Sequence, residues 1–439
     1  MGLPKDRTRR RKGSGGLKTI KIGMIFVILL VSNTSAPAEE VSLHGFVQGN
    51  YAARITGEEL PGPEGGDFIL GEERLQIKLA ASSQGAGFFL KTDFFRDAVS
   101  RTTDPPAGRA GTDLREAYLD YGGGSFDLRL GRQIITWGVG DLLFINDVFP
   151  KDYAAFFSGR PLEYLKIGSD AFKADFFSDR ISAELVVIPF FQSDNLPAPD
   201  RFFLSDPFPG LQRMTEEPRA DLENTELALR LYRNLSGFDT AVYAYKGFFR
   251  TPGMRTDDPI SPTQVTLFFP RRAVYGASAQ GNALGGVVGL EAGYDDSLDD
   301  RTGTDPAIQN SMVKYLAGYQ RQIWTDFTAG LQYYGEYLLD YGSYRDALPA
   351  GFPAQDRLRQ IVTIRLTQFL RYQTVRLSLF GFYSPTDEDY YFIPEVRYSF
   401  TDALWGAMGA NIFGGREETT FFGQLDENDN VYVTARYEF

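Results

Sequence analysis

The sequence contains no cysteine and only one histidine, His44. The absence of cysteine excludes disulfide bonds, thiolate metal sites, cysteine nucleophiles and covalent haem attachment. A Ser-His-Asp hydrolase or a histidine-rich metal site would have to use His44 itself. His44 shares the polar face of a predicted strand with Phe46, Gln48 and Asn50, and nothing around it resembles a catalytic site. We therefore expect a protein that is not an enzyme and that carries no cofactor and no metal.

Long apolar runs are also missing, so no transmembrane helix is expected after the first forty residues. Residues 1–38 combine a basic stretch, an apolar run at 22–31, and Ala36 and Ala38 in an A-x-A arrangement. This layout is typical of a secretory signal peptide and predicts export of residues 39–439 through the Sec pathway. Loss of its eight basic residues and one acidic residue would lower the formal charge from −12 to about −19. No nucleic-acid partner is expected for so acidic a chain.

What the remaining chain does contain is a series of segments that alternate apolar and polar residues, which is the period of a β-strand. Short connections such as GGGS and GNALG alternate along the chain with long polar ones such as GREETTFFGQLDEND. Bacterial outer-membrane barrels show this alternation of short turns and long loops. The pattern predicts an all-β fold, a transmembrane antiparallel up-and-down β-barrel of about 18 strands, with about 16 as the alternative count. The predicted strands are 42–55, 68–82, 87–96, 113–121, 125–137, 163–177, 180–191, 223–234, 238–250, 266–281, 285–295, 310–323, 326–340, 357–372, 374–384, 389–401, 404–414 and 430–439.

The two faces of these strands differ in polarity. In residues 74–80, RLQIKLA, one face carries Leu75, Ile77 and Leu79, and the other carries charged and amide side chains. Lipid outside and water inside satisfy both faces of such a strand. Aromatic residues near strand ends are expected in interfacial girdles; they are Tyr121, Trp137, Trp324, Tyr372, Tyr398, Phe400 and Trp405.

The stretch LREAYLDYGGGSFDLRLGRQIITWGVGDLLFINDVFPKDY, residues 114–153, resembles the Gram-negative outer-membrane porin superfamily. The likeness is greatest to the alginate-export-like and related uncharacterised porin families, and it includes Asp147, Pro150 and Asp152 in a D-x-x-x-P-x-D segment. The resemblance implies a barrel of 18 or a similar number of strands, and a loop after GRQIITWG that folds into the pore.

Charged residues on the polar faces are expected to line the lumen and set its selectivity. Several of the arginines fall on neighbouring predicted strands in the last third of the chain, where stacked guanidiniums would favour carboxylate or phosphate solutes. Alternatively, arginine and glutamate pair across strands and hold the wall rigid. The predicted pore-lining residues are Arg74, Lys78, Arg129, Arg230, Arg359, Arg365, Arg376, Arg397, Arg436, Glu116 and Asp120.

Residues 138–162 form a connection with more aromatic and aliphatic residues than an exposed loop should have. A loop tucked into the lumen as a constriction would bury them; packing at a subunit interface or against lipid at the rim is the alternative. The charged residues expected to line the narrowing are Asp141, Asp147, Lys151, Asp152 and Arg160.

Three charged features fit the barrel less simply. By parity Arg132 falls on the lipid side with Leu128 and Leu130, so either a bulge at Gly131 turns it inward or it lies near the rim. The acidic runs at 295–300 and 426–430 could offer oxygen ligands to Ca²⁺, but they lack the spacing of a calcium loop and are ordinary for external loops.

The last predicted strand carries Tyr437 and Phe439, which resemble the terminal signal that barrel-assembly machinery reads. The sequence thus predicts a Gram-negative outer-membrane porin for passive diffusion of small hydrophilic solutes, with anions as one option. An exporter of an acidic polysaccharide and a barrel that sheathes a partner protein are the alternatives. Expected partners are outer-membrane lipid and lipopolysaccharide, the assembly machinery and the solutes, and a homotrimer is left open.

Overall fold

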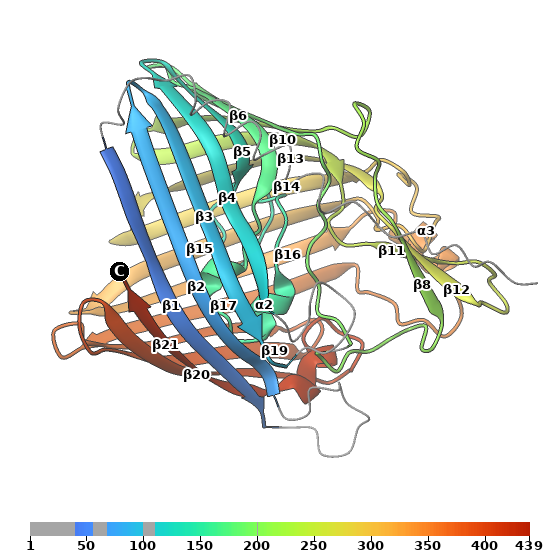
Figure 1. Cartoon of the computed structure of the whole chain (residues 1–439). Helices are drawn as coiled ribbons and strands as arrows, with labels where there is room; N and C mark the ends of the chain where they lie inside the picture. The colour runs from blue at the N-terminus through green and yellow to red at the C-terminus, as the bar shows by residue number, and fades with distance from the viewer. Residues whose placement is uncertain (1–39, 56–67, 100–109, 200) are drawn as a thin grey trace, which may run out of the picture.

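The computed structural model describes residues 40–55, 68–99, 110–199 and 201–439, so the predicted signal peptide at 1–38 lies outside the described residues. Eighteen strands form one sheet (Figure 1). They are β1 (Glu40–Arg54), β2 (Phe68–Ser83), β3 (Ala86–Asp97), β4 (Ala110–Gly123), β5 (Phe126–Gln133), β6 (Ser169–Phe176), β7 (Ser182–Ile188), β9 (Glu226–Leu235), β10 (Phe238–Phe248), β13 (Arg271–Ala283), β14 (Gly286–Ser297), β15 (Met312–Trp324), β16 (Phe327–Leu338), β17 (Leu358–Leu370), β18 (Val375–Ser384), β19 (Asp389–Ser399), β20 (Leu404–Gly415) and β21 (Asn430–Glu438).

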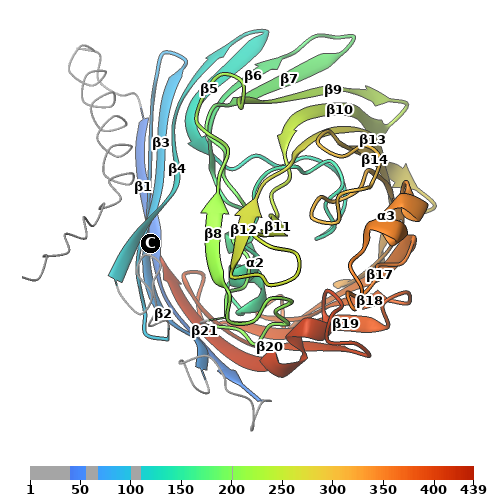
Figure 2. The same cartoon turned by 90° about the vertical axis from the view of Figure 1, so that its right-hand side faces the viewer.

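The sheet closes on itself. Each strand pairs antiparallel with its neighbours, and β1 pairs with β21 in the register Gln48 opposite Arg436. Figure 2 shows the ring nearly end-on. Closure removes both sheet edges and satisfies the backbone groups that a bilayer cannot. The prediction of an antiparallel up-and-down barrel of about 18 strands is confirmed.

The two ends of the barrel differ as the connection lengths predict. Short turns such as 84–85 and 284–285 join strands at one end, here called the turn end. Phe439 lies at this end and is hydrogen-bonded to Gly45 of β1. At the other end, here called the loop end, a small sheet forms from β8 (Gln212–Glu216), β11 (Gly253–Thr256) and β12 (Gln264–Phe268), with β12 parallel to β8. The short helices α3 (Tyr341–Ala347) and η2 (Gly423–Asn428) lie in two further loops of this end. Among the described residues, no helix has the length and apolar character needed to cross a membrane.

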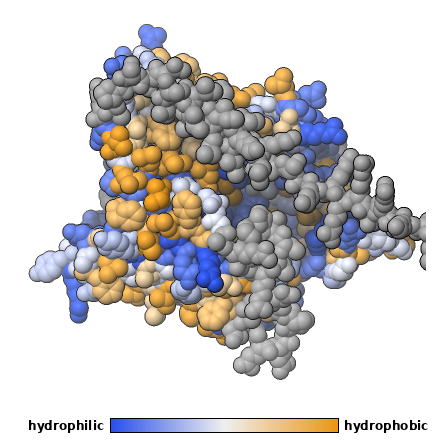
Figure 3. All heavy atoms as spheres, in the orientation of Figure 1, coloured by the Kyte–Doolittle hydropathy of each residue, from blue (hydrophilic) through white to orange (hydrophobic). Residues whose placement is uncertain are grey.

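The wall separates apolar from polar side chains by alternation. On β1, Val41, Leu43, Val47 and Tyr51 are 46–62% exposed, whereas Gln48 is 1% exposed on the inner face. Figure 3 shows an apolar area on the outer wall with polar residues to its sides. A lipid environment removes the cost that exposure of this surface to water would carry.

The two predicted strands on either side of residues 134–168 are shorter than expected. β5 ends at Gln133 rather than at residue 137, and β6 begins at Ser169 rather than at residue 163. The intervening chain leaves the wall and turns inward. The prediction that Trp137 belongs to an interfacial girdle is therefore wrong. Trp137 is 4% exposed, packs on Phe149, and donates a hydrogen bond to the Glu184 carboxylate at 2.9 Å.

Two alternatives were open for Arg132, and the structure matches the one without a bulge at Gly131. The pairings of β5 run through Gly131 without a register shift, and Arg132 remains on the outer face beside Asp170 of β6. Its Nε and Nη2 donate to the two Asp170 oxygens at 2.8 and 2.7 Å, so the charge is neutralised close to the end of the strand. A register shift lies instead between β3 and β4, where the buried Arg115 is the extra residue and faces inward.

Candidate functional site: the lumen and its inner loop

Residues 134–168, here called the inner loop, lie inside the barrel. They contain α2 (Tyr153–Phe157) and the 3₁₀ turn η1 (Leu162–Tyr164), and Figures 1 and 2 show α2 within the ring of strands. The predicted constriction segment 138–162 is part of this loop. Three of its aromatic residues are buried, as its composition suggested: Phe149, Phe156 and Phe157 are 2–7% exposed, and Phe144 and Tyr153 are partly buried.

The first half of the inner loop is held to β14 by one carboxylate. Glu291, 4% exposed, accepts from the backbone N–H groups of Val139 at 2.7 Å and Gly140 at 3.1 Å through Oε2. Its Oε1 accepts from the backbone N and the side-chain Nδ2 of Asn146, both at 2.9 Å. A buried carboxylate is stable only with such donors. Sequence reasoning missed Glu291 because nothing distinguishes it from other inward carboxylates.

Asp141 connects the same half of the loop to β16 and β17. Its backbone N–H donates to Gln332 Oε1 at 2.8 Å, and Gln332 Nε2 donates back to the Asp141 carbonyl at 2.9 Å. Its carboxylate receives both Nε and Nη2 of Arg365, the latter at 2.7 Å. A two-point guanidinium–carboxylate pair fixes orientation as well as distance.

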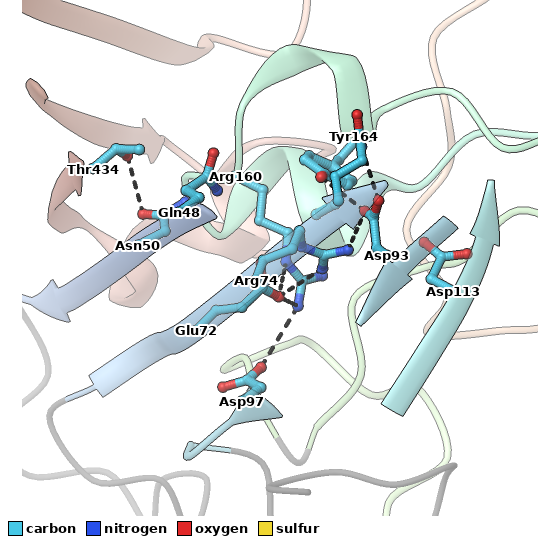
Figure 4. Close-up of polar contacts among 12 residues, drawn as sticks. Gln48, Asn50, Glu72, Arg74, Asp93, Asp97, Asp113, Arg160, Tyr164 and Thr434 are labelled. Carbon is cyan, nitrogen blue, oxygen red and sulfur yellow. Dashed lines mark hydrogen bonds and ion pairs between the residues drawn. The ribbon is translucent and has the colours of Figure 1, made fainter. Parts of the chain in front are cut away.

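The second half of the loop docks on β2 and β3 (Figure 4). Arg74, 4% exposed, lies between Glu72 and Asp93, with nitrogen–oxygen distances of 2.8 and 2.6 Å. From the loop, Arg160 reaches Glu72 at 2.8 Å, and the Tyr164 hydroxyl donates to Asp93 at 2.8 Å. Arg74, predicted to line the pore, is thus covered by the inner loop and belongs to its docking site.

Aromatic packing holds α2 to the opposite wall. Phe157 contacts the rings of Tyr391 on β19 and Phe413 on β20 edge-on, with centroids 5.6 Å apart in each case. Phe156 adds an edge-on contact to Tyr391 at 5.4 Å. Burial of each ring and its edge-to-face geometry both stabilise this contact. The loop is therefore fixed at both walls rather than suspended in the lumen.

The predicted charges inside the loop mostly satisfy one another. Lys151, 2% exposed, donates to the Asp147 carboxylate at 2.9 Å, and Lys166 contacts the other Asp147 oxygen. Burial lowers the pKa of the Lys151 ammonium, and the Asp147 carboxylate opposes that shift. Asp152 caps α2 by accepting from the backbone N of Ala155 at 2.7 Å. These three predicted residues shape the loop; Asp141 and Arg160 reach the lumen wall.

Between the inner loop and the β17–β21 wall lies a cavity of about 420 Å³, here called the arginine cavity. Its lining contains two glutamates and five arginines, and four of the arginines lie on strands of the wall. The charged lining residues are Arg160, Glu163, Arg365, Arg376, Glu395, Arg397 and Arg436.

Four of the five guanidiniums have a carboxylate partner. Besides the pairs already described, Arg376 lies 2.6 Å from Glu395, and Arg436 lies 2.5 Å from Glu163 of the loop. Arg397 differs: among the described residues no carboxylate lies within ion-pair distance of it. It stacks 3.8 Å above the ring of Trp405, which is 7% exposed and faces the lumen instead of forming part of a girdle.

The register places Arg397 directly opposite Arg376. Like charges at opposed positions destabilise a sheet unless something offsets them. Glu395 offsets one guanidinium and Trp405 covers the other, so a net positive charge is left in the cavity. An anion bound here would relieve the remaining repulsion.

The other predicted lining residues lie on the inner face away from this cavity. Arg129 stacks 4.1 Å above Tyr118, Arg230 lies 3.6 Å from Glu184, and Arg359 lies between Asp387 at 2.5 Å and Glu336 at 3.7 Å. The contacts of Arg230 and Arg359 match the alternative in which arginine and carboxylate pair along the wall. The remaining positions are Lys78, opposite Lys91 on β3; Glu116, 3.9 Å from Lys91; and Asp120, opposite Arg129.

At the turn end, Tyr437 and Phe439 are 51% and 47% exposed on the outer wall. The backbone of Phe439 exchanges two hydrogen bonds with Gly45, at 2.9 and 3.0 Å. Their reading by assembly machinery remains a prediction.

The acidic runs considered for Ca²⁺ are engaged in other contacts. Asp295 lies 2.7 Å from Lys314, and Asp296 lies 2.8 Å from Arg301. Asp429 accepts from the backbone N of Phe413 at 2.6 Å. Within the described ranges, no group of three or more histidine, aspartate or glutamate side chains is arranged to hold a metal ion.

Comparison with solved structures shows the same fold. OccK2 (OpdF) of Pseudomonas aeruginosa, solved in complex with glucuronate, matches with a TM-score of 0.56 at 8% identity over 92% of this chain and 98% of that one. OccAB4 of Acinetobacter baumannii matches with a TM-score of 0.56 at 9% identity over 92% and 100%. OccK9 (OpdG) of P. aeruginosa matches with 0.55 at 10% identity over 92% and 98%. At these identities the likeness extends to the fold alone.

Comparison with curated proteins gives no match. A family model, described as protein of unknown function (DUF1302), matches residues 64–334, which is more than half of the chain. The predicted closeness to alginate-export-like families therefore has no support from the comparisons and stays a prediction. The chain belongs to the DUF1302 family.

Proposed function

We propose that this protein is a bacterial outer-membrane channel for passive diffusion of small hydrophilic anions, and that it is not an enzyme. In this proposal the loop end faces the exterior and the inner loop narrows the lumen. The observation that carries it is the arginine cavity, where four of five guanidiniums pair with a carboxylate and Arg397 has no carboxylate partner among the described residues. Lipid on the outer wall and assembly machinery are the partners this proposal requires.

The chemistry of the cavity favours carboxylates and phosphates. Guanidinium groups are planar and always charged, and they bind two anion oxygens at once. Four of them are already partly neutralised, which moderates the attraction. Conduction requires such a balance, because a solute must bind well enough to enter and weakly enough to leave.

The size of the cavity favours small solutes over the alternatives. About 420 Å³ lies within the range of small-molecule pockets. An inner loop fixed at both walls occupies part of the lumen that a folded protein partner would need, which argues against a sheath. The structural neighbour OccK2 was solved with glucuronate, a small carboxylate, which supports the same solute class.

Reversal potentials in planar bilayers test this function. Purified protein under a salt gradient should conduct steadily with anion selectivity, and Arg397→Gln should move the reversal potential toward cations. Arg233→Gln is the matched control, because Arg233 is exposed on β9 and alternates with the inward Arg230. Absence of channel conductance in the bilayer, or equal reversal potentials for Arg397→Gln and the wild type, would refute the proposal.

A further inference from the structure

The loop end encloses a second and larger cavity of about 800 Å³, here called the vestibule. Its walls come from the loops that carry β8, β11, β12 and α3, with Gln424 of η2 on one side. In Figure 2, β8, β11 and β12 cross the view over the ring and α3 lies on its margin. The vestibule therefore stands at the end of the barrel through which an external solute would enter.

The lining of the vestibule is unusual for external loops. Seven of its residues are prolines and four are aromatic. Among the described residues that line it, only Arg255 and Asp305 are charged, and they pair at 2.7 Å. The rest of the lining mixes these rings and prolines with uncharged polar side chains such as Thr251, Asn310 and Gln355. A concavity of this size with aromatic walls and a few polar groups has the composition of a small-molecule site.

The vestibule is built to stay open. Phe208 and Phe352, from two different loops, meet with ring centroids 5.7 Å apart. Arg255 stacks 4.6 Å above Phe268 of β12. The turn that joins β11 to β12 is held by Asp257, whose carboxylate accepts from the backbone N of Thr263 at 2.9 Å and its hydroxyl at 2.6 Å. Proline-rich, cross-braced walls lose little entropy when a ligand binds.

The vestibule and the arginine cavity differ in the chemistry they offer. The vestibule presents rings and proline faces without net charge, whereas the arginine cavity presents guanidiniums. A solute that suits both has a flat apolar part and one anionic group. Aromatic rings stack favourably on such surfaces.

We propose that the vestibule is a binding site for the aromatic ring of small aromatic carboxylates, which it captures before they reach the arginine cavity. The carboxylate part of this assignment rests on the proposed anion-channel function. Burial of one ring should strengthen binding roughly tenfold to a hundredfold over a solute that lacks it.

The test compares neutral and charged probes on the full chain in lipid nanodiscs. Benzamide and acetamide report on the ring alone, and benzoate and acetate add the charge. Affinities are measured by saturation-transfer NMR, with empty nanodiscs subtracted to remove partition into lipid. The variants are Phe208→Ser with Phe352→Ser, and the control is Leu222→Ser, a residue 94% exposed in the same loop as Phe208 but outside the vestibule.

We expect benzamide to bind at least about tenfold more tightly than acetamide, and the double variant to lose about tenfold in affinity for benzamide and for benzoate. Leu222→Ser should match the wild type, and acetate conductance should not change in the double variant. Equal affinities for benzamide and acetamide, or an unchanged benzamide affinity in the double variant, would overturn the site. If benzamide binds as expected but the channel selects cations, the proposed function fails and the assignment to carboxylates falls with it, while the ring site stands.

Discussion

Replacement of Glu291 by glutamine should release the first half of the inner loop from β14. The carboxylate accepts four hydrogen bonds, two at each oxygen. A glutamine side chain keeps one acceptor oxygen, and its NH₂ group faces two donors that it cannot accept from. Two charge-assisted hydrogen bonds are therefore lost. At about 1.5–3 kcal/mol each, the free energy of docking falls by roughly 3–6 kcal/mol.

This loss is large enough to measure as local opening. Each 1.4 kcal/mol or so changes an equilibrium tenfold, so the open population of the loop should rise about a hundredfold or more. Hydrogen–deuterium exchange followed by mass spectrometry on peptides that cover 138–147 should speed up by that factor. Glu73→Gln, an exposed position on the outer face of β2, makes the same charge change and should leave the exchange of these peptides unaltered.

Exchange in Glu291→Gln within about threefold of the wild type would refute this reasoning. It would show that the contacts of Asp141 with Gln332 and Arg365 suffice to hold the loop. Faster exchange across the whole barrel would instead indicate global destabilisation, which a comparison of peptides from β19 would reveal.

Two further predictions concern other anchors of the lumen. Phe157→Ala removes a ring that is 3% exposed and should cost about 3–5 kcal/mol of packing against Tyr391 and Phe413. Single-channel recordings of this variant should show a larger and noisier conductance. An unchanged conductance would contradict the role of α2 in narrowing the lumen. Burial raises the pKa of Asp429 from 3.8 to about 6, so the folded loop before β21 favours the protonated carboxyl. The resulting stabilisation of the loop is fully present below pH 3.8 and is lost as the pH rises through about 6. Exchange in residues 416–429, corrected for intrinsic rates, should be slower at pH 4 than at pH 7. Asp429→Asn should reduce this difference, and the remainder is expected from Asp426, whose pKa burial also raises.

The strands could be predicted because the two faces of the barrel wall differ in polarity. A wall with an apolar outer face and a polar inner face must alternate residue by residue, and all eighteen predicted segments correspond to barrel strands. The small sheet of β8, β11 and β12 was not predicted, because its strands are only 4–5 residues long and β8 and β12 pair across about fifty residues of sequence. No local periodicity marks such a pairing.

The site was predictable only in part, for a related reason. Parity identifies a residue as inward but does not say what stands opposite it. Arg74 and Arg397 have the same inward parity, yet the inner loop covers Arg74 and leaves Arg397 in a cavity. Trp405 was assigned to a girdle because tryptophan suits membrane interfaces, whereas its ring supports Arg397 in the lumen. The difference depends on how a loop folds back over the wall, which the strand pattern does not encode.

Arg365 and Arg436 couple the position of the inner loop to the charge of the cavity. Both line the cavity, and each binds a carboxylate of the loop, Asp141 or Glu163. A loop that moved away would take both carboxylates with it and would leave two more uncompensated guanidiniums in the lumen. A wider lumen would then also be more positive at the wall, so in the proposed channel a narrower lumen would go with weaker attraction for anions. Arg376 and Arg397 make their described contacts with the wall, at Glu395 and Trp405, so the charge they contribute to the cavity does not depend on where the loop lies; of the two, only Arg397 lacks a carboxylate partner among the described residues.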